Sequence, residues 1–194
     1  MSGAKARHMR PDLGRIVLWV PVEVRYGDLD VQGHVNNVTY FTYFEQARVR
    51  FLAELRQHAR GAGLGDAAGA ADADSAGTAE QIGPDDIPFV VVSAEAIYRR
   101  PITALAPVSV GIDCAHMTHT SLALRYAVCD QSRGQLYATG TTTITSVDQQ
   151  SGRPRALPTW ARQGVEALLG PAGDAGTAGA PGAPGATRTT GQHA

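Results

Sequence analysis

The chain has 194 residues, of which 43% are hydrophobic, and a formal net charge of −1. This length allows one sizeable hydrophobic core, and the near-zero charge gives no general attraction to nucleic acid or to an anionic membrane. No apolar run approaches the ~18 residues of a membrane span, and the apolar run 16–20 is too short for the core of a signal peptide. We therefore expect a cytoplasmic protein.

The first expected elements are a leader and a strand. Residues 1–14 are basic and are expected to form a flexible leader. Residues 15–30 have strong β character, because Val22 and Val24 alternate with charged residues. Pro21 favours an edge position or a bulge in this strand.

A long helix is predicted over residues 38–55. Large apolar or aromatic side chains recur there every three or four residues, which is typical of a partly buried amphipathic helix. Asn36 and Asn37 stand where a helix N-cap belongs. The main apolar row consists of Tyr40, Phe44, Ala47, Phe51 and Leu55.

The second half of the chain reads as strands bounded by low-complexity sequence. Residues 59–84 almost lack large apolar side chains and predict a low-complexity insertion on the surface. A short helix is predicted at 159–169, and residues 171–194 predict a disordered tail. A single domain over 15–170 is therefore expected. Its later strands are predicted at 88–99, 107–117, 121–130 and 135–147.

The order of these elements is one strand, one long helix and four strands in a meander. An apolar helix cannot bury itself, so we expect an α+β fold in which a curved antiparallel sheet of about five strands wraps around the helix. Cys114 and Cys129 fall on successive strands. Pairing through a turn near His119 would place them opposite Arg125 and Val110, so a disulfide is not expected.

The segment 25–48 carries the residues that suggest chemistry. Asp28 and Asp30 lie at the end of the first strand, shortly before the long helix. A helix N-terminus presents unpaired N–H groups and a partial positive charge. A carboxylate beside it can act on an acyl carbonyl whose oxygen those N–H groups hold. The pattern therefore indicates acyl-transfer chemistry.

Residues 26–33 read YGDLDVQG, and residues 34–40 read HVNNVTY. The first run resembles the aromatic–Gly/Glu–Asp–x–Asp–x–x–Gly segment of hotdog-fold thioesterases of the 4-hydroxybenzoyl-CoA thioesterase type, which leads into a long helix. The second run is similar to the acyl-ACP thioesterase branch of the same superfamily. The resemblance extends over about residues 17–150 and implies a hotdog fold.

The resemblance implies a catalytic carboxylate at Asp30 and an oxyanion-binding backbone N–H near Asn37. In the acyl-ACP branch, an Asn two residues after the Asp and a His four residues after it assist catalysis. His34 matches this pattern, whereas Gln32 replaces the Asn. We therefore name Asp30, Asn37 and His34 as candidate catalytic residues.

Substrate-binding positions are expected around the same segment and at the ends of later strands. The two arginines among them suit the phosphates of CoA, because a guanidinium binds phosphate well, although arginines at a strand end can equally be solvated. The expected substrate-binding residues are Gly33, Tyr40, Arg99, Arg100 and Ser121.

Each candidate also has a structural interpretation. Asp30 can cap the turn or the helix, as Asp commonly does, and Asp28 is assigned to the turn. Asn36 and Asn37 can serve as helix-start residues, although an oxyanion role needs only a backbone amide. Glu45 is a secondary catalytic candidate, because related enzymes use a helix Glu, and its alternative is a solvated or ion-paired position.

Metal and cofactor chemistry are not expected. His116 and His119 are three residues apart, and on a strand or turn this spacing points them to opposite faces. The expected reaction is hydrolysis of an acyl-CoA to a free acid and CoA, with Asp30 as general base or as nucleophile. A non-catalytic acyl-CoA sensor and a hotdog hydroxyacyl-CoA dehydratase are the alternatives.

The expected partners are the acyl-CoA substrate and further copies of the chain. The sequence does not separate CoA from acyl-carrier protein as the carrier of the acyl group. An open five-stranded sheet with one helix leaves strand edges and apolar faces uncovered. We therefore expect a homodimer or a homotetramer, with no nucleic-acid or membrane partner.

Overall fold

The computed structural model describes residues 16–61, 88–103 and 105–169. The expected leader and tail, and most of the expected insertion, lie outside these residues and are not tested. No helix of the described part is long and apolar enough to cross a membrane.

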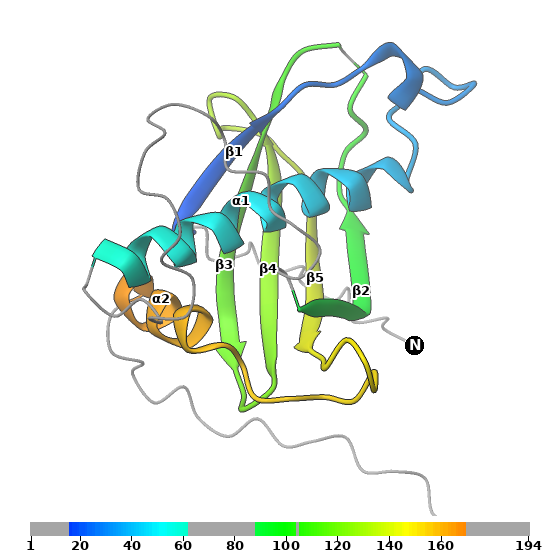
Figure 1. Cartoon of the computed structure of the whole chain (residues 1–194). Helices are drawn as coiled ribbons and strands as arrows, with labels where there is room; N and C mark the ends of the chain where they lie inside the picture. The colour runs from blue at the N-terminus through cyan, green and yellow to red at the C-terminus, as the bar shows by residue number, and fades with distance from the viewer. Residues whose placement is uncertain (1–15, 62–87, 104, 170–194) are drawn as a thin grey trace, which may run out of the picture.

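A curved, five-stranded antiparallel sheet forms one layer of the molecule, as predicted (Figure 1). The strand order is β1-β3-β4-β5-β2, so β1 and β2 lie at opposite edges. Pro21 therefore stands on an edge strand, where its missing N–H disrupts no inner ladder. The strands are β1 (Leu18–Val22), β2 (Phe89–Tyr98), β3 (Val108–Met117), β4 (Ser121–Asp130) and β5 (Leu136–Ser146).

The predicted four-strand meander is wrong for β2. Tight turns join β3, β4 and β5, which pair consecutively, whereas β1 occupies the other side of β3. The free side of β5 therefore receives β2, which pairs along it from Phe89 to Tyr98. This crossover carries the end of β2 to the first turn of the long helix (Figure 1).

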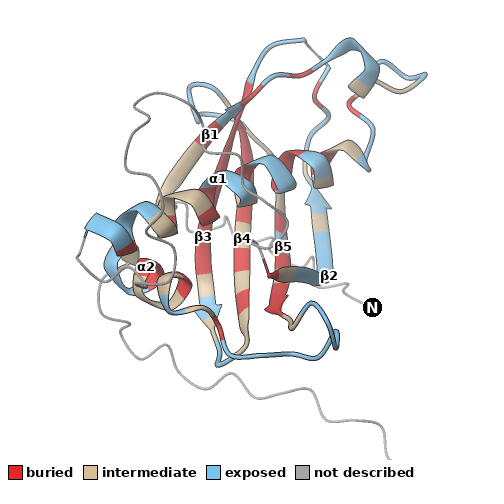
Figure 2. Cartoon of the chain, viewed as in Figure 1, coloured by how far each residue is buried: buried red, intermediate tan, exposed pale blue. Residues whose placement is uncertain are grey.

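Helix α1 (Thr39–Gly61) lies across one face of the sheet, and α2 (Thr159–Leu169) packs beside its C-terminal end (Figure 1). The sheet side of α1 is buried and its outer side is exposed (Figure 2). This division follows the predicted apolar row, because all five of its members are buried. The buried residues of α1 are Tyr40, Tyr43, Phe44, Ala47, Phe51, Leu52, Leu55 and Ala59.

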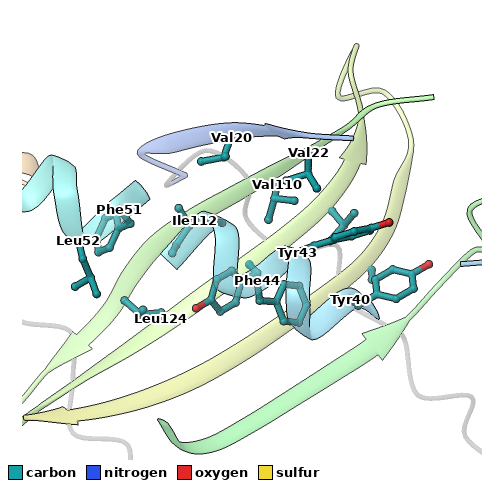
Figure 3. Packing of buried hydrophobic residues seen from close by; sticks show 14 of the residues in the cluster. Val20, Val22, Tyr40, Tyr43, Phe44, Phe51, Leu52, Val110, Ile112 and Leu124 are labelled. Carbon is teal, nitrogen blue, oxygen red and sulfur yellow. The ribbon is translucent and has the colours of Figure 1, made fainter. Parts of the chain in front are cut away.

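The core lies between α1 and the inner face of the sheet (Figure 3). Phe44 is fully buried and stacks on Tyr126 of β4, with 4.5 Å between ring centroids. Its ring also lies against Gly140 of β5, where any Cβ would collide with it. Burial of one such aromatic side chain contributes about 2–3 kcal/mol, so this contact fixes how the first half of α1 sits on the sheet.

The long helix extends beyond its predicted end at residue 55. It ends at Gly61, so residues 59–61 are helical rather than part of the predicted insertion. The extension is supported by α2, whose Gly164 approaches the backbone of Leu55 so closely that a Cβ would not fit. Ala59 is buried in this added turn. Packing against a second helix therefore outweighs the weak apolar pattern after residue 55.

The first strand is shorter than the predicted 15–30, because β1 ends at Val22 and a 3₁₀ helix, η2 (Tyr26–Asp28), follows. The Asp28 carboxylate accepts the backbone N–H of Arg25 at 2.9 Å, which closes a turn instead of continuing a strand.

The predicted register of the two cysteines is wrong by one residue. Cys114 pairs with Leu124, and Cys129 pairs with Ser109, because a bulge between Cys114 and His116 shifts the ladder. Both thiols are free and buried.

Candidate active site

A tight hairpin between η2 and α1 presents Asp30. Leu29 and Val35 form an isolated antiparallel bridge, and the Gly33 N–H donates to the Asp30 carbonyl at 3.0 Å. The Asp30 N–H donates to the His34 carbonyl at 2.7 Å. Gly33 has a φ of 73°, in the left-handed region that glycine adopts without steric penalty. Gly33 therefore allows the chain to turn back within four residues.

The Asp30 side chain has one held oxygen and one unbonded oxygen. Its Oδ1 accepts the backbone N–H groups of Gln32 at 2.8 Å and of His34 at 3.2 Å. Within the described part of the chain, no group donates a hydrogen bond to Oδ2. The turn-capping interpretation of Asp30 is therefore correct for one oxygen, and the other remains available to bind a proton or attack a carbonyl.

Asp28 joins the hairpin to α1. In addition to the Arg25 N–H, its Oδ2 accepts the hydroxyl of Tyr43 at 2.8 Å. Burial, followed by the hydrogen bond and charge of Asp28, raises the pKa of Tyr43 above the ordinary value of 10.0. Asp28 does not line the cavity described below. The two carboxylates therefore take different positions, with Asp28 fastening the loop to the helix.

The start of α1 is built around Asn36 and Asn37. Asn36 Oδ1 accepts the Val38 N–H at 3.0 Å, and its backbone carbonyl accepts the Thr39 N–H at 2.9 Å. This side-chain bond is the capping expected of an Asn at a helix start. The Asn37 N–H has no hydrogen-bond acceptor among the described residues. It is thus an unpaired donor at the positive end of α1.

A cavity of about 500 Å³ opens where the hairpin, the start of α1 and the end of β2 meet. It brings together six of the predicted residues: the candidate catalytic residues Asp30, His34 and Asn37, and the substrate-binding candidates Tyr40, Arg99 and Arg100. The complete lining consists of Asp30, Gln32, His34, Val35, Asn36, Asn37, Tyr40, Tyr98, Arg99, Arg100 and Pro101.

Two cavity residues have unusual environments. The Nε of Arg99 is buried and has no hydrogen-bond partner in the described residues. A buried, unpaired guanidinium nitrogen is costly, and an anionic ligand would satisfy it. Tyr40 is buried, and this burial raises its pKa to about 12, so its hydroxyl stays protonated at neutral pH.

A family model for the thioesterase-like superfamily matches residues 24–165, a range that includes every residue of the cavity. The chain belongs to the thioesterase-like superfamily. The matched range begins just after β1 and ends within α2. The fold is the hotdog fold of its thioesterase neighbours.

Several proteins of known structure or sequence are similar to this chain. A thioesterase from Thermus thermophilus, solved in complex with coenzyme A and Zn, has 29% identity and a TM-score of 0.59, covering 80% of this chain and 96% of that one. The PA5185 protein of Pseudomonas aeruginosa PAO1 has 25% identity and a TM-score of 0.60, covering 80% and 93%. Bacillus subtilis YsmA is 24% identical over 148 residues, which span 76% of this chain and 82% of YsmA.

Three predicted site residues of this superfamily member lie outside the cavity lining. Gly33 shapes the hairpin. Glu45 is exposed on α1, where its Oε1 lies 4.0 Å from Nη2 of Arg48 in an ion pair. Ser121 opens β4, where its hydroxyl pairs with that of Thr145 at 2.8 Å. Their catalytic or binding roles stay predictions. His116 and His119 lie outside the lining too, and the described residues contain no group of three or more His, Cys, Asp or Glu side chains that could hold a metal ion.

Five cavity residues were not among the predicted site residues: Gln32, Val35, Asn36, Tyr98 and Pro101. Tyr98 ends β2 and donates its hydroxyl to the Asn37 carbonyl at 2.8 Å across 61 positions of sequence. A signal was present, because the expected substrate-binding Arg99 follows directly. Tyr98 reaches Asn37 only because β2 pairs with the free edge of β5, and the predicted meander placed β2 beside β3 instead.

Proposed function

We propose that this thioesterase-like protein hydrolyses acyl-CoA thioesters to a free acid and CoA. The observation that carries the proposal is the shared cavity of Asp30 and Asn37. Asp30, which has an unbonded carboxylate oxygen, and Asn37, whose backbone N–H is unpaired, both line this cavity. Acyl transfer needs these two elements, one to activate or supply the nucleophile and one to stabilise the oxyanion.

Asp30 Oδ2 acts on the thioester in one of two ways. It removes a proton from water as the water attacks, or it attacks the carbonyl itself to give a mixed anhydride that water then cleaves. In both, the Asn37 N–H stabilises the negative charge that develops on the thioester oxygen. His34 lines the same cavity and is proposed to assist proton transfer to the departing thiolate.

The carrier group of the substrate is assigned to CoA. Arg99, whose Nε is unpartnered, and the exposed Arg100 both line the cavity, and arginine binds phosphate groups well. The Thermus relative was solved with coenzyme A. Because residues 26–33 resemble the 4-hydroxybenzoyl-CoA thioesterase type, aromatic acyl groups are the first substrates to test.

The proposal is tested with purified protein, a panel of aromatic and aliphatic acyl-CoA thioesters, and a reagent that reports free thiols. Release of CoA with at least one substrate is expected, and an acyl-carrier-protein thioester with the same acyl group gives the matched comparison. Saturable binding without thiol release would instead support a sensor, and formation of an enoyl product a dehydratase. Either outcome contradicts the proposal.

We propose that the protein works as a homodimer joined through the β2 edge. Val90, Val91 and Val92 of this edge strand are 44%, 48% and 57% exposed, and an apolar sheet edge favours pairing with another strand. Light scattering should give about twice the chain mass of 20.4 kDa, or four times if two dimers associate. Val91→Lys should give a monomer, whereas Val49→Lys on the exposed side of α1 should not. A stable wild-type monomer would contradict the dimer.

A further inference from the structure

The peptide unit between Asn37 and Val38 is fixed at both of its polar ends. Its carbonyl accepts the Tyr98 hydroxyl at 2.8 Å, and its N–H donates to Asn36 Oδ1 at 3.0 Å. One bond comes from the preceding residue and the other from the last residue of β2. A single peptide plane is therefore held from opposite sides by two side chains.

The neighbouring peptide units are also restrained. The Asn36 N–H donates to the Asp28 carbonyl at 2.8 Å, and the Asn36 carbonyl accepts the Thr39 N–H at 2.9 Å. The Asn37 N–H belongs to the same peptide unit as that Asn36 carbonyl, and it is left as the unpaired donor. Three consecutive peptide units therefore set the direction in which this N–H points.

Tyr98 ties this turn to the sheet. Its ring packs edge-on against Tyr40, the second residue of α1, with 5.0 Å between ring centroids and planes at 74°. Burial raises the pKa of Tyr98, so its hydroxyl remains a donor at neutral pH. The ring holds the side chain in place, and the hydroxyl holds the Asn37 carbonyl.

We propose that Tyr98 is a positioning residue that holds the Asn37 N–H in the direction needed to stabilise the oxyanion. This inference rests on the proposed thioester hydrolysis. Preorganised donors stabilise a developing charge because they do not reorient during the reaction. Without the tether from β2, the helix start samples more orientations, and the donor is aligned for a smaller fraction of the time.

The test compares two Tyr→Phe variants that each lose a hydrogen-bonded hydroxyl group. Tyr98→Phe keeps the ring against Tyr40 and should lower kcat about 10-fold with KM unchanged, because donor alignment affects the transition state more than substrate binding. Tyr126→Phe is the matched control, since its hydroxyl pairs with Thr142 at 2.7 Å in the core and does not line the cavity. It should lower the melting temperature and leave kcat unchanged.

A second measurement does not depend on activity. The Val38 amide should exchange with solvent deuterium about 10-fold faster in Tyr98→Phe than in wild type, because the peptide unit loses one of its two restraints. The same amide should exchange at the wild-type rate in Tyr126→Phe. This readout separates the positioning role from the proposed function, because it retains its meaning if wild type hydrolyses no acyl-CoA.

A double-mutant cycle with Asn36→Ala completes the test. Because Tyr98 and Asn36 hold the same peptide unit, the combined loss in kcat should be smaller than the product of the two single losses. Unchanged kcat in Tyr98→Phe, a loss that appears only as a higher KM, or unchanged Val38 exchange would overturn the inference. A higher KM alone would instead indicate direct contact between the Tyr98 hydroxyl and the substrate.

Discussion

Replacing Asp30 by Asn tests the proposed chemistry with little change in shape. The held Oδ1 accepts two backbone N–H groups, from Gln32 and His34, and the amide oxygen of an Asn can accept the same pair. The other position changes from a carboxylate oxygen to an NH₂ group, which neither accepts a proton nor attacks a carbonyl. The hairpin should therefore survive while the reaction does not.

Loss of a general base lowers a rate by about 10²–10⁴-fold, so kcat of Asp30→Asn should fall at least ~10²-fold. The two retained hydrogen bonds to Oδ1 limit the loss in unfolding free energy to about 1 kcal/mol. The assay measures thiol release from the best acyl-CoA, together with thermal unfolding of the same sample. KM should change little, because the arginines on the cavity wall are unaltered.

Asp28→Asn is the matched control. Its Oδ2 accepts both the Arg25 N–H and the Tyr43 hydroxyl, and an Asn oxygen in place of this carboxylate weakens both bonds. The expected result is a stability loss of about 1–2 kcal/mol with a smaller effect on kcat than Asp30→Asn. A folded Asp30→Asn protein with near wild-type turnover would refute the assignment, and the base would then be sought at His34 or Glu45.

Three further substitutions test other parts of the structure. Gly140→Ala places a Cβ against the Phe44 ring and should destabilise the protein by about 1–3 kcal/mol, measured by denaturant unfolding; an unchanged midpoint would contradict the packing. The Cβ added by Gly33→Ala has no neighbouring atom within 4 Å, so the strain comes only from the φ of 73°. The free energy of unfolding should fall by about 1 kcal/mol, and Gly33→Asn should lower it by less. Arg99→Met should raise KM for acyl-CoA about 10-fold and leave kcat largely unchanged, and an unaltered KM would argue against a phosphate contact.

The fold was largely predictable because its strongest patterns match its burial. The row through Phe44 and Phe51 predicted the helix and its buried face, and the strand predicted at 121–130 has the same bounds as β4. Strand order was not predictable in the same way, because alternation identifies a strand and its buried face but not its neighbour. The end of α1 was missed because its last turns are supported by α2 rather than by their own apolar residues.

The cavity residues also differ in whether local sequence or strand order identifies them. Asp30, His34 and Asn37 are close in sequence, so two adjacent motifs, 26–33 and 34–40, located all three. Tyr98 was missed because its contact with Asn37 depends on the crossover of β2, a long-range consequence of strand order. Local sequence thus indicated the proposed reacting groups, whereas the proposed positioning residue, Tyr98, was identified only from the tertiary structure.

The Tyr43 hydroxyl bond has a consequence for measurements made as a function of pH. A raised pKa keeps the phenol protonated, so the stability it confers is fully present below the ordinary tyrosine value of 10.0 and is lost only as pH rises through the higher pKa of the folded protein. The hydrogen bond from Tyr43 to Asp28, which holds the Asp30 hairpin on α1, therefore persists throughout the neutral and mildly alkaline pH range. An inflection in the dependence of the rate on pH over that range therefore reports ionisation of a cavity group or of the substrate, and not loss of the Tyr43–Asp28 hydrogen bond.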